Sequence, residues 1–315
     1  MRALVRNRPW LITLAVLAIL AVVNTALQPS FVEGSVLRSN LTTFLPLVLV
    51  AVGQTYVVLA GDIDLSVGST VALGNVVTVS VIAAAGADTG AILLGMAAGV
   101  ATGVAAGLLN GFLVAFVRLQ PIVTTFATGI VLGGAAIWVL PQAGLPVPDG
   151  YWMGYAGEVF GVPSVVWILV AALVAVALLS RSVFVAHLLA VGGNRTGAFQ
   201  TGLPLRRIRV SAYVLSGLFS ALAALCLTGE TASGDPLLGA SLALSSISAV
   251  VLGGTALSGG QGGALGSVLG AFVLGLIGNV IFFAGLPFEY QTLVQGLIVL
   301  LALAGGVLVT RRATS

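Results

Sequence analysis

Charged residues are sparse along this chain, and they separate long stretches of apolar sequence. The uncharged intervals cover residues 9–32, 39–61, 65–87, 89–117, 119–148, 159–180, 210–229, 236–288 and 290–310. A helix needs about 20 apolar residues to cross a bilayer, so eight intervals predict one membrane span each. The interval 236–288 is long enough for two spans, separated by the glycine-rich break Ser258–Gly263. The pattern predicts an all-α membrane protein with about ten transmembrane helices in one polytopic domain, residues 1–315.

The composition supports a membrane protein and excludes a soluble enzyme or a disordered chain. Only 7% of the residues are charged and 59% are hydrophobic, which leaves too few charges to cover a soluble protein of this length. With ten spans, eleven of the twelve arginines fall on the side of both termini, and only Arg38 falls on the other. The positive-inside rule then predicts cytoplasmic N- and C-termini. The net charge of +3 reflects this topology, so we expect membrane lipid and no nucleic acid as a partner.

Glycine accounts for 42 of the 315 residues, and many glycines recur at intervals of four inside the predicted spans. Gly95, Gly99, Gly103 and Gly107 lie on one face of one predicted helix. Small residues at this spacing let helix backbones approach closely in lipid. We therefore expect a compact helix bundle.

The first interruption of the apolar pattern is Gly61–Ser69, which contains two carboxylates two residues apart. Asp62 and Asp64 cannot lie on the same face of a helix, so the segment fits a turn between two spans better. In one interpretation, Asp64 or Ser66 caps the next helix through a side-chain oxygen, near the positive end of the helix dipole. In the other, the segment is a re-entrant or discontinuous element whose free backbone groups face a transport pathway.

A second interruption, Val250–Gly260, repeats the first. It aligns with Val57–Gly68 when one gap is placed opposite Asp64. The identical pairs are Val57/Val250, Val58/Val251, Leu59/Leu252, Gly61/Gly254, Leu65/Leu257, Ser66/Ser258 and Gly68/Gly260. Both copies join a span that runs inward to one that runs outward. Internal repeats with glycine-broken helices at matching positions are typical of transporters.

Residues 180–210 form the longest hydrophilic loop on the inner side and carry five of the twelve arginines. A short helix is expected over Arg195–Thr201, ended by Gly202 and a nearby proline. Ala198 and Phe199 place apolar groups in this polar loop. One interpretation is a positive-inside anchor. The other is a cytoplasmic coupling loop that docks into a groove of a partner protein.

Three stretches of the chain carry a resemblance to a known family. They are Gly61–Ser69; Val191–Asn194 with Ala198, Gly202 and Arg206–Arg209, followed by Ser211–Gly217; and Gly253–Thr255 with Leu257–Gly260 and Leu265–Gly266. These motifs are similar to those of the permease subunits of bacterial ABC importers for monosaccharides, the ribose-type branch. The resemblance covers about residues 40–310. Asp62 departs from the family, which more often has glycine there.

The resemblance implies that this chain works as one subunit of a larger assembly in the bacterial plasma (inner) membrane. The implied partners are a cytoplasmic ATP-binding subunit, a periplasmic or lipid-anchored sugar-binding protein and a second permease copy, as a homodimer or with a paralogous permease. ATP and magnesium would be bound by the ATPase. The sequence itself contains no catalytic triad, metal-ligand spacing or Walker loop, so we expect this chain to bind no cofactor.

We therefore expect a permease subunit, not itself an enzyme, that moves a monosaccharide into the cytoplasm by ATP hydrolysis in a separate subunit. The residues expected at the substrate pathway or helix breaks are Gly61, Asp62, Asp64, Ser66, Gly68, Gly254, Thr255, Ser258 and Gly260. Those expected to couple to the ATPase are Gly193, Asn194, Ala198, Phe199, Gly202, Arg206 and Arg207. The alternative is a proton- or sodium-coupled secondary transporter that uses Asp62 or Asp64.

Overall fold

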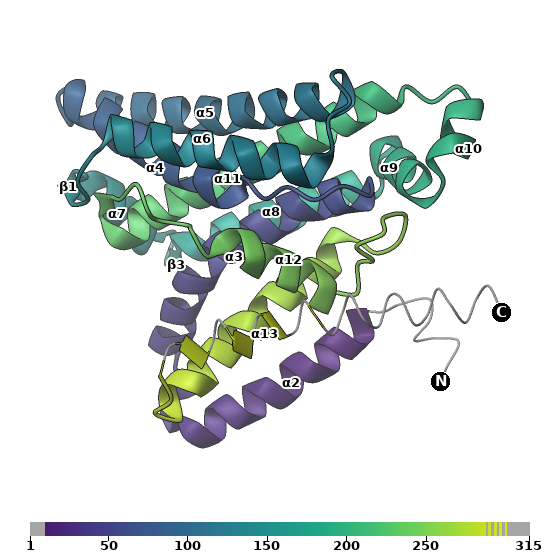
Figure 1. Ribbon diagram of the computed structural model, residues 1–315. Helices are drawn as coiled ribbons and strands as arrows, with labels where there is room; N and C mark the ends of the chain where they lie inside the picture. The colour runs from purple at the N-terminus through teal and green to yellow at the C-terminus, as the bar shows by residue number, and fades with distance from the viewer. Residues whose placement is uncertain (1–9, 288, 291–292, 295, 298–299, 301–315) are drawn as a thin grey trace.

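A computed structural model of the chain describes residues 10–287 together with 289–290, 293–294, 296–297 and 300. The first half contains α2 (Trp10–Leu27), η1 (Pro29–Val32), α3 (Gly34–Leu59), α4 (Val67–Ala84), α5 (Thr89–Ala115), α6 (Pro121–Val139), β1 (Leu145–Pro146) and α7 (Asp149–Ala156). The second half contains β2 (Glu158–Val159), β3 (Val162–Pro163), α8 (Ser164–Ser180), α9 (Val183–Gly193), α10 (Arg195–Gln200), α11 (Leu205–Thr231), β4 (Ser233–Gly234), α12 (Leu242–Leu252) and α13 (Ala264–Phe283). The fold is a helix bundle (Figure 1).

Seven of the described helices are long and apolar enough to cross a membrane, or up to eight if α8 and α9, bent by 68°, form one span. This confirms a multi-pass membrane protein. The interval 236–288, predicted to hold two spans, holds one long helix, α13, and the 11-residue α12. At 1.5 Å per residue α12 is about 16 Å long, roughly half the thickness of the hydrocarbon layer. Both termini and most of the span predicted over 290–310 lie outside the described residues.

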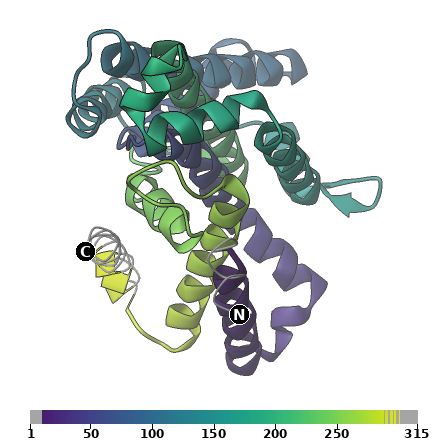
Figure 2. The same ribbon diagram turned by 90° about the vertical axis from the view of Figure 1, so that its right-hand side faces the viewer.

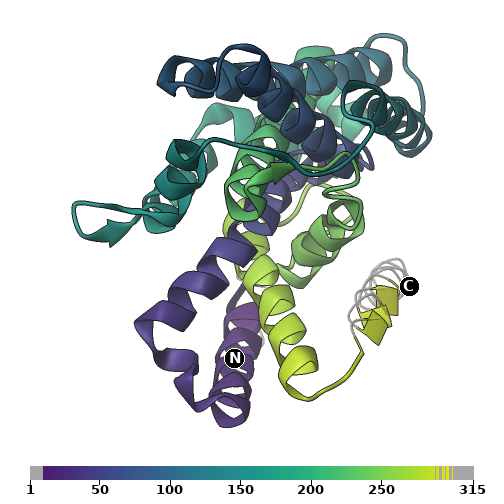
Figure 3. The same cartoon turned by 90° about the vertical axis from the view of Figure 1, so that its left-hand side faces the viewer.

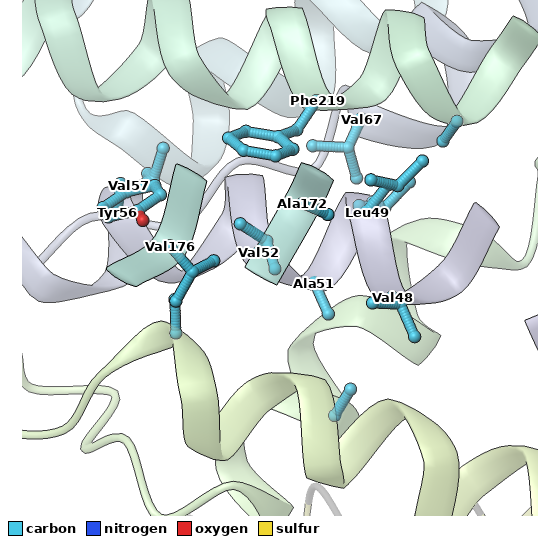
Figure 4. Close-up of a cluster of buried hydrophobic side chains, with 14 of the residues drawn as sticks. Val48, Leu49, Ala51, Val52, Tyr56, Val57, Val67, Ala172, Val176 and Phe219 are labelled. Carbon is cyan, nitrogen blue, oxygen red and sulfur yellow. The ribbon is translucent and has the colours of Figure 1, made fainter. Parts of the chain in front are cut away.

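Helix α3 forms the centre of the bundle. It packs against α8, α9, α11, α12 and α13, and every residue from Val48 to Leu59 is buried. The buried stretch includes the polar residues Gln54 and Thr55, and polar groups within a membrane-spanning helix usually face the interior of the bundle, which favours this central position. The ring of Tyr56 lies 6.4 Å from those of Phe184 and Phe219, and Figure 4 shows the aliphatic side chains around it.

The predicted glycine stripe brings α5 against α4 and α11. Gly95, Gly99, Gly103 and Gly107 are all buried. A methyl group on Gly103 would collide with the backbone of α11 at Gly217, so α5 and α11 pack backbone to backbone at this crossing. This confirms the compact bundle that the small-residue spacing predicts.

The two ends of the bundle carry different elements. Helices α9 and α10 lie at one end (Figures 1 and 2), and β1, α7 and the β2–β3 hairpin lie at the other (Figures 1 and 3). Strand β1 pairs with β4 through Leu145 and Gly234. Phe160 at the tip of the hairpin is 94% exposed, and Figure 3 shows this hairpin projecting from the bundle. Large apolar side chains such as Trp138 are also exposed, as expected where a bundle faces lipid.

Candidate functional site

The two aligned interruptions end their helices with the same backbone geometry. Helices α3 and α12 stop at the equivalent residues Leu59 and Leu252, and Gly61 and Gly254 follow with φ of 79° and 82°. In both copies the two residues after the cap donate hydrogen bonds back to the last turn, which is the Schellman arrangement. The bonds are Gly61 N to Val58 O (2.9 Å), Asp62 N to Val57 O (3.2 Å), Gly254 N to Val251 O (2.9 Å) and Thr255 N to Val250 O (3.1 Å). The backbone thus has the predicted repeat over these residues.

Beyond these caps the two copies diverge. Ser66 directly precedes α4, whereas the aligned Ser258 is exposed in a longer loop that reaches Ala264 before α13 begins. Gly68 lies in the first turn of α4, where a methyl group would collide with the Gly239 carbonyl oxygen. Thr255 is buried, and its Oγ1 accepts a bond of 3.2 Å from the Gly263 N–H. The repeat is therefore local to the helix ends.

Three glycine-rich segments meet at the end of the bundle that carries α9 and α10. A methyl group on Gly192, in the last turn of α9, would collide with the Leu59 carbonyl oxygen. A Cβ on Gly259 would lie 2.7 Å from the Gly61 Cα and 3.0 Å from the Gly192 Cα, and the Gly260 N–H donates to the Leu59 carbonyl at 3.1 Å. We call Gly61, Gly192, Gly259 and Gly260 the glycine junction. It joins both helix breaks to the segment predicted to couple with a partner.

Asp62 is 2% exposed and binds two arginines. Arg209, near the start of α11, makes two bonds to the carboxylate, Nε to Oδ2 at 2.9 Å and Nη2 to Oδ1 at 3.0 Å. Arg195, the first residue of α10, makes one bond, Nη2 to Oδ1 at 3.2 Å, and the same Nη2 donates to the Ala60 carbonyl at 3.2 Å. Paired bonds from a guanidinium to a carboxylate are strong and directional. The negative charge of Asp62 is thus compensated inside the protein.

Asp64 is also 2% exposed, and its carboxylate accepts three hydrogen bonds. Oδ1 accepts from the Ser66 N–H at 2.9 Å and the Ser66 hydroxyl at 2.6 Å, and Oδ2 accepts from the Ser216 hydroxyl of α11 at 3.0 Å. Burial raises the pKa of the Asp64 carboxyl, and these hydrogen bonds act in the opposite direction. Asp64 bonds to the residue before α4, while Ser66 makes no side-chain cap. The Asp64 bond to the Ser66 N–H is an Asx turn before the helix and not a bond to an N–H of α4, so the expected side-chain cap is found at neither residue.

A buried polar network that the sequence did not reveal extends from Asp64 through the bundle. The Asn110 side chain of α5 donates to the Ser66 hydroxyl at 2.7 Å and accepts from the Thr128 hydroxyl of α6 at 2.6 Å. In the orientation that satisfies both groups, the Gln54 amide of α3 bonds to the backbone of Asp64 at 3.2 and 3.3 Å. The sequence signal that could have revealed this network is the presence of single polar residues, such as Gln54 and Asn110, inside apolar spans. Such residues usually pair with one another.

The segment 180–210 contains α9 and α10, and α10 matches the predicted short helix. The Asn194 side chain caps it by accepting from the Gly197 N–H at 2.9 Å, and Gly202 follows its end with φ of 81°. Ala198 is buried in the protein's own core, so the expectation that it projects outward is wrong. Phe199 is 72% exposed, as expected. Gly193 is exposed, and its Cβ position has no neighbour closer than 3.9 Å.

A cavity of about 740 Å³ opens beside α10 and the start of α11. Its lining includes Phe199 and five arginines, namely Arg118, Arg195, Arg206, Arg207 and Arg209. The Arg206 guanidinium lies 5.6 Å from the centre of the Phe116 ring, within range of a cation–π interaction. No acidic side chain belongs to the lining among the described residues. The cavity is therefore strongly positive.

Comparison with protein families decides the class of this protein. Residues 36–303 match the family described as "Branched-chain amino acid transport system / permease component". The chain belongs to this family. The ribose-type resemblance inferred from three motifs is thereby confirmed at the level of permeases, and the chain is a multi-pass transport component rather than an enzyme.

The curated relatives of this permease include proteins that are named as permeases of sugar transport systems. The chain is 36% identical to the ribose import permease protein RbsC of Bacillus subtilis, covering 91% of this chain and 89% of the relative. It is 33% identical to the protein of that name from Escherichia coli, with 94% of each covered. It is 37% identical to the L-arabinose transport system permease protein AraH of Escherichia coli, over 81% of this chain and 77% of the relative. No solved structure matches the chain.

Proposed function

We propose that this permease is the membrane-spanning subunit of an ATP-binding-cassette importer that moves a monosaccharide into the cytoplasm. The relatives named for ribose and L-arabinose import support the substrate class. The observation that carries the mechanism is the contact of α9 and α10 with both helix breaks, through the glycine junction and through Arg195 and Asp62.

In this proposal the end of the bundle with α9 and α10 is cytoplasmic, and residues 180–210 form the coupling loop. A separate subunit binds ATP and magnesium and hydrolyses the nucleotide. A periplasmic or lipid-anchored protein delivers the sugar at the opposite end. The whole chain, residues 1–315, acts as one domain in the inner membrane, with ten spans and both termini in the cytoplasm, and pairs with a second permease copy.

The coupling step follows from the contacts. A push on α9 and α10 reaches the end of α3 through Arg195 of α10 and through Gly192 of α9, which touches Leu59. It reaches the loop after α12 through Gly259 and Gly260. Close-packed backbones transmit displacement because they cannot be compressed. The side chains of Asp62, Asp64, Ser66 and Thr255 are buried in the present conformation, so their part in the pathway is to position the two breaks as these move.

The docking face for the ATPase is the cavity lined by Phe199 and the five arginines. An exposed phenyl ring leaves roughly 1.5–3 kcal/mol of burial free energy unused, and a partner groove would recover it. The arginines favour an acidic rim on that partner, because complementary charge speeds and orients association. Arg206 and Arg207 are exposed on this face and carry the expected coupling role.

The alternative, a secondary transporter, has one observation in its favour: Asp64 is a carboxyl group buried inside the bundle, and ionisable groups in such positions often mark ion or proton pathways. Asp62 is a poor ion site because two arginines already bind it. Proteoliposomes distinguish the two mechanisms. Uptake that needs ATP and the co-encoded ATPase, and that survives a protonophore, supports the importer. Uptake driven by a proton or sodium gradient without ATPase would establish the alternative.

Phe199→Ala tests the docking face directly. Truncation of a central aromatic at an interface often costs 2 kcal/mol or more, so the affinity for the ATPase should fall about 30-fold. The control is Phe160→Ala, which removes an even more exposed ring, 94% against 72% for Phe199, at the opposite end of the bundle. Affinity is measured by titrating the ATPase onto purified permease, and size-exclusion chromatography verifies the fold. Unchanged affinity in Phe199→Ala would show that α10 does not bind the ATPase.

A further inference from the structure

Asp62 holds its two arginines unequally. Arg209 makes two bonds of 2.9 and 3.0 Å, and its side chain is 12% exposed. Arg195 makes a single bond of 3.2 Å, and its side chain is 46% exposed. Arg209 alone can therefore neutralise Asp62 if Arg195 leaves. The ion pair between Arg195 and Asp62 can therefore break without leaving the buried Asp62 charge unpaired.

The two arginines also belong to different helices. Arg209 lies near the start of the long helix α11, whereas Arg195 begins the short α10 at the surface. Asp62 itself is the second residue of the α3 Schellman cap, beside the glycine junction. A buried ion pair is a poor way to gain stability, because desolvation of the charges offsets most of their attraction. A switchable contact between α10 and the break is a better explanation for a carboxylate at this position.

We propose that Asp62 is a positioning residue of the transport cycle. Arg209 fixes its carboxylate at the end of α3, and Arg195 ties α10 to that carboxylate in one state of the transporter and releases it in another. While the Arg195 contact is closed, movement of α10 is transmitted directly to the break between α3 and α4. This role in transport rests on the proposed function, whereas the contact itself can be tested on the permease alone.

The first test is hydrogen exchange on the purified permease without any partner. Arg195→Gln and Asp62→Asn should each speed exchange of the amides of residues 195–202 about tenfold, because both variants remove the Arg195–Asp62 contact. Arg195→Gln is the safer variant, since it leaves no buried charge unpaired. The control, Arg38→Gln, breaks the exposed pair with Glu158 at the opposite end of the bundle and should leave this exchange unchanged. An unchanged exchange rate in Arg195→Gln would refute the claim that the Arg195–Asp62 contact holds α10 against the end of α3.

The second test measures ATP hydrolysed per sugar imported in proteoliposomes with the co-encoded ATPase. Arg195→Gln should raise this ratio roughly tenfold, within the usual range for a residue of a coupling network, while the melting temperature stays near that of the wild type. The double variant with Asp62→Asn should raise the ratio by less than the product of the two single effects, because the two changes share the Arg195–Asp62 contact. Asp62→Glu should restore coupling in part. A purely structural contact would lower stability and leave the ratio unchanged.

The outcomes separate this inference from the proposed function. Wild-type uptake that does not need ATP would refute the importer but leave the exchange test standing. ATP-driven uptake with a normal ratio in Arg195→Gln would uphold the importer and refute the role of Asp62. Additive effects in the double variant would show that Arg195 and Asp62 act through different contacts, and would also refute it.

Discussion

Replacement of Asp64 tests how much of the bundle depends on one buried carboxylate. Asp64→Ala removes the acceptor of three hydrogen bonds, 2.6 to 3.0 Å long. The Ser66 N–H is fixed by the backbone and loses its partner outright, whereas the hydroxyls of Ser66 and Ser216 can rotate. A buried donor left unpaired costs about 1–3 kcal/mol. Complete loss of the bond from the Ser66 N–H, together with partial loss of the two hydroxyl bonds, predicts a decrease of about 2–4 kcal/mol in the free energy of unfolding.

Asp64→Asn should cost less, about 1–2 kcal/mol, because an amide keeps one oxygen acceptor. That oxygen can still accept from the Ser66 N–H, while the amide nitrogen can donate to the Ser216 hydroxyl, which is able to accept. An isolated helix cap would lose only about 1 kcal/mol on change to alanine. The larger value expected here reflects the contact with α11, which a simple cap does not have.

The assay is the free energy of unfolding, from a denaturant titration in detergent micelles. Ser216→Ala serves as the matched partner, since it removes one donor and leaves the Ser66 bonds in place. The two substitutions should be non-additive in a double-mutant cycle, because they share one hydrogen bond. Wild-type stability of Asp64→Ala would refute the reasoning. If both Asp64 variants abolish uptake but melt like the wild type, the charge serves transport directly.

Two further predictions concern the glycine junction and the orientation. Gly192→Ala should destabilise the protein by about 1–3 kcal/mol, as overpacking does, whereas Gly193→Ala, with no atom closer than 3.9 Å, should not; equal melting temperatures would contradict the junction. In a Cys226→Ala background, a cysteine at the exposed Gln200 should react with an impermeant reagent only from the cytoplasm, and one at Phe160 only from outside. Labelling of position 200 from outside would reverse the proposed topology.

Several features of this protein follow from short stretches of sequence. Long uncharged intervals specify membrane spans, since hydrophobic length alone decides whether a helix can cross a bilayer. The repeated Schellman ends at Gly61 and Gly254 and the cap at Asn194 are also local, because their hydrogen bonds join residues within one turn. The sequence by itself therefore determined the class of protein, the helix breaks and the short helix α10.

The contacts that give these elements a function join residues far apart in the chain. Asp62 is separated from Arg195 by 133 residues and from Arg209 by 147, so nothing in its neighbourhood indicates that its charge is compensated. In the same way, the burial of Ala198 depends on neighbours contributed by other elements of the bundle. Periodicity shows which residues share a helix face, but only the packed bundle decides what that face touches. The close contact of Gly61, Gly192 and Gly259 is likewise decided only by the tertiary structure, because close backbone packing is a property of the assembled helices.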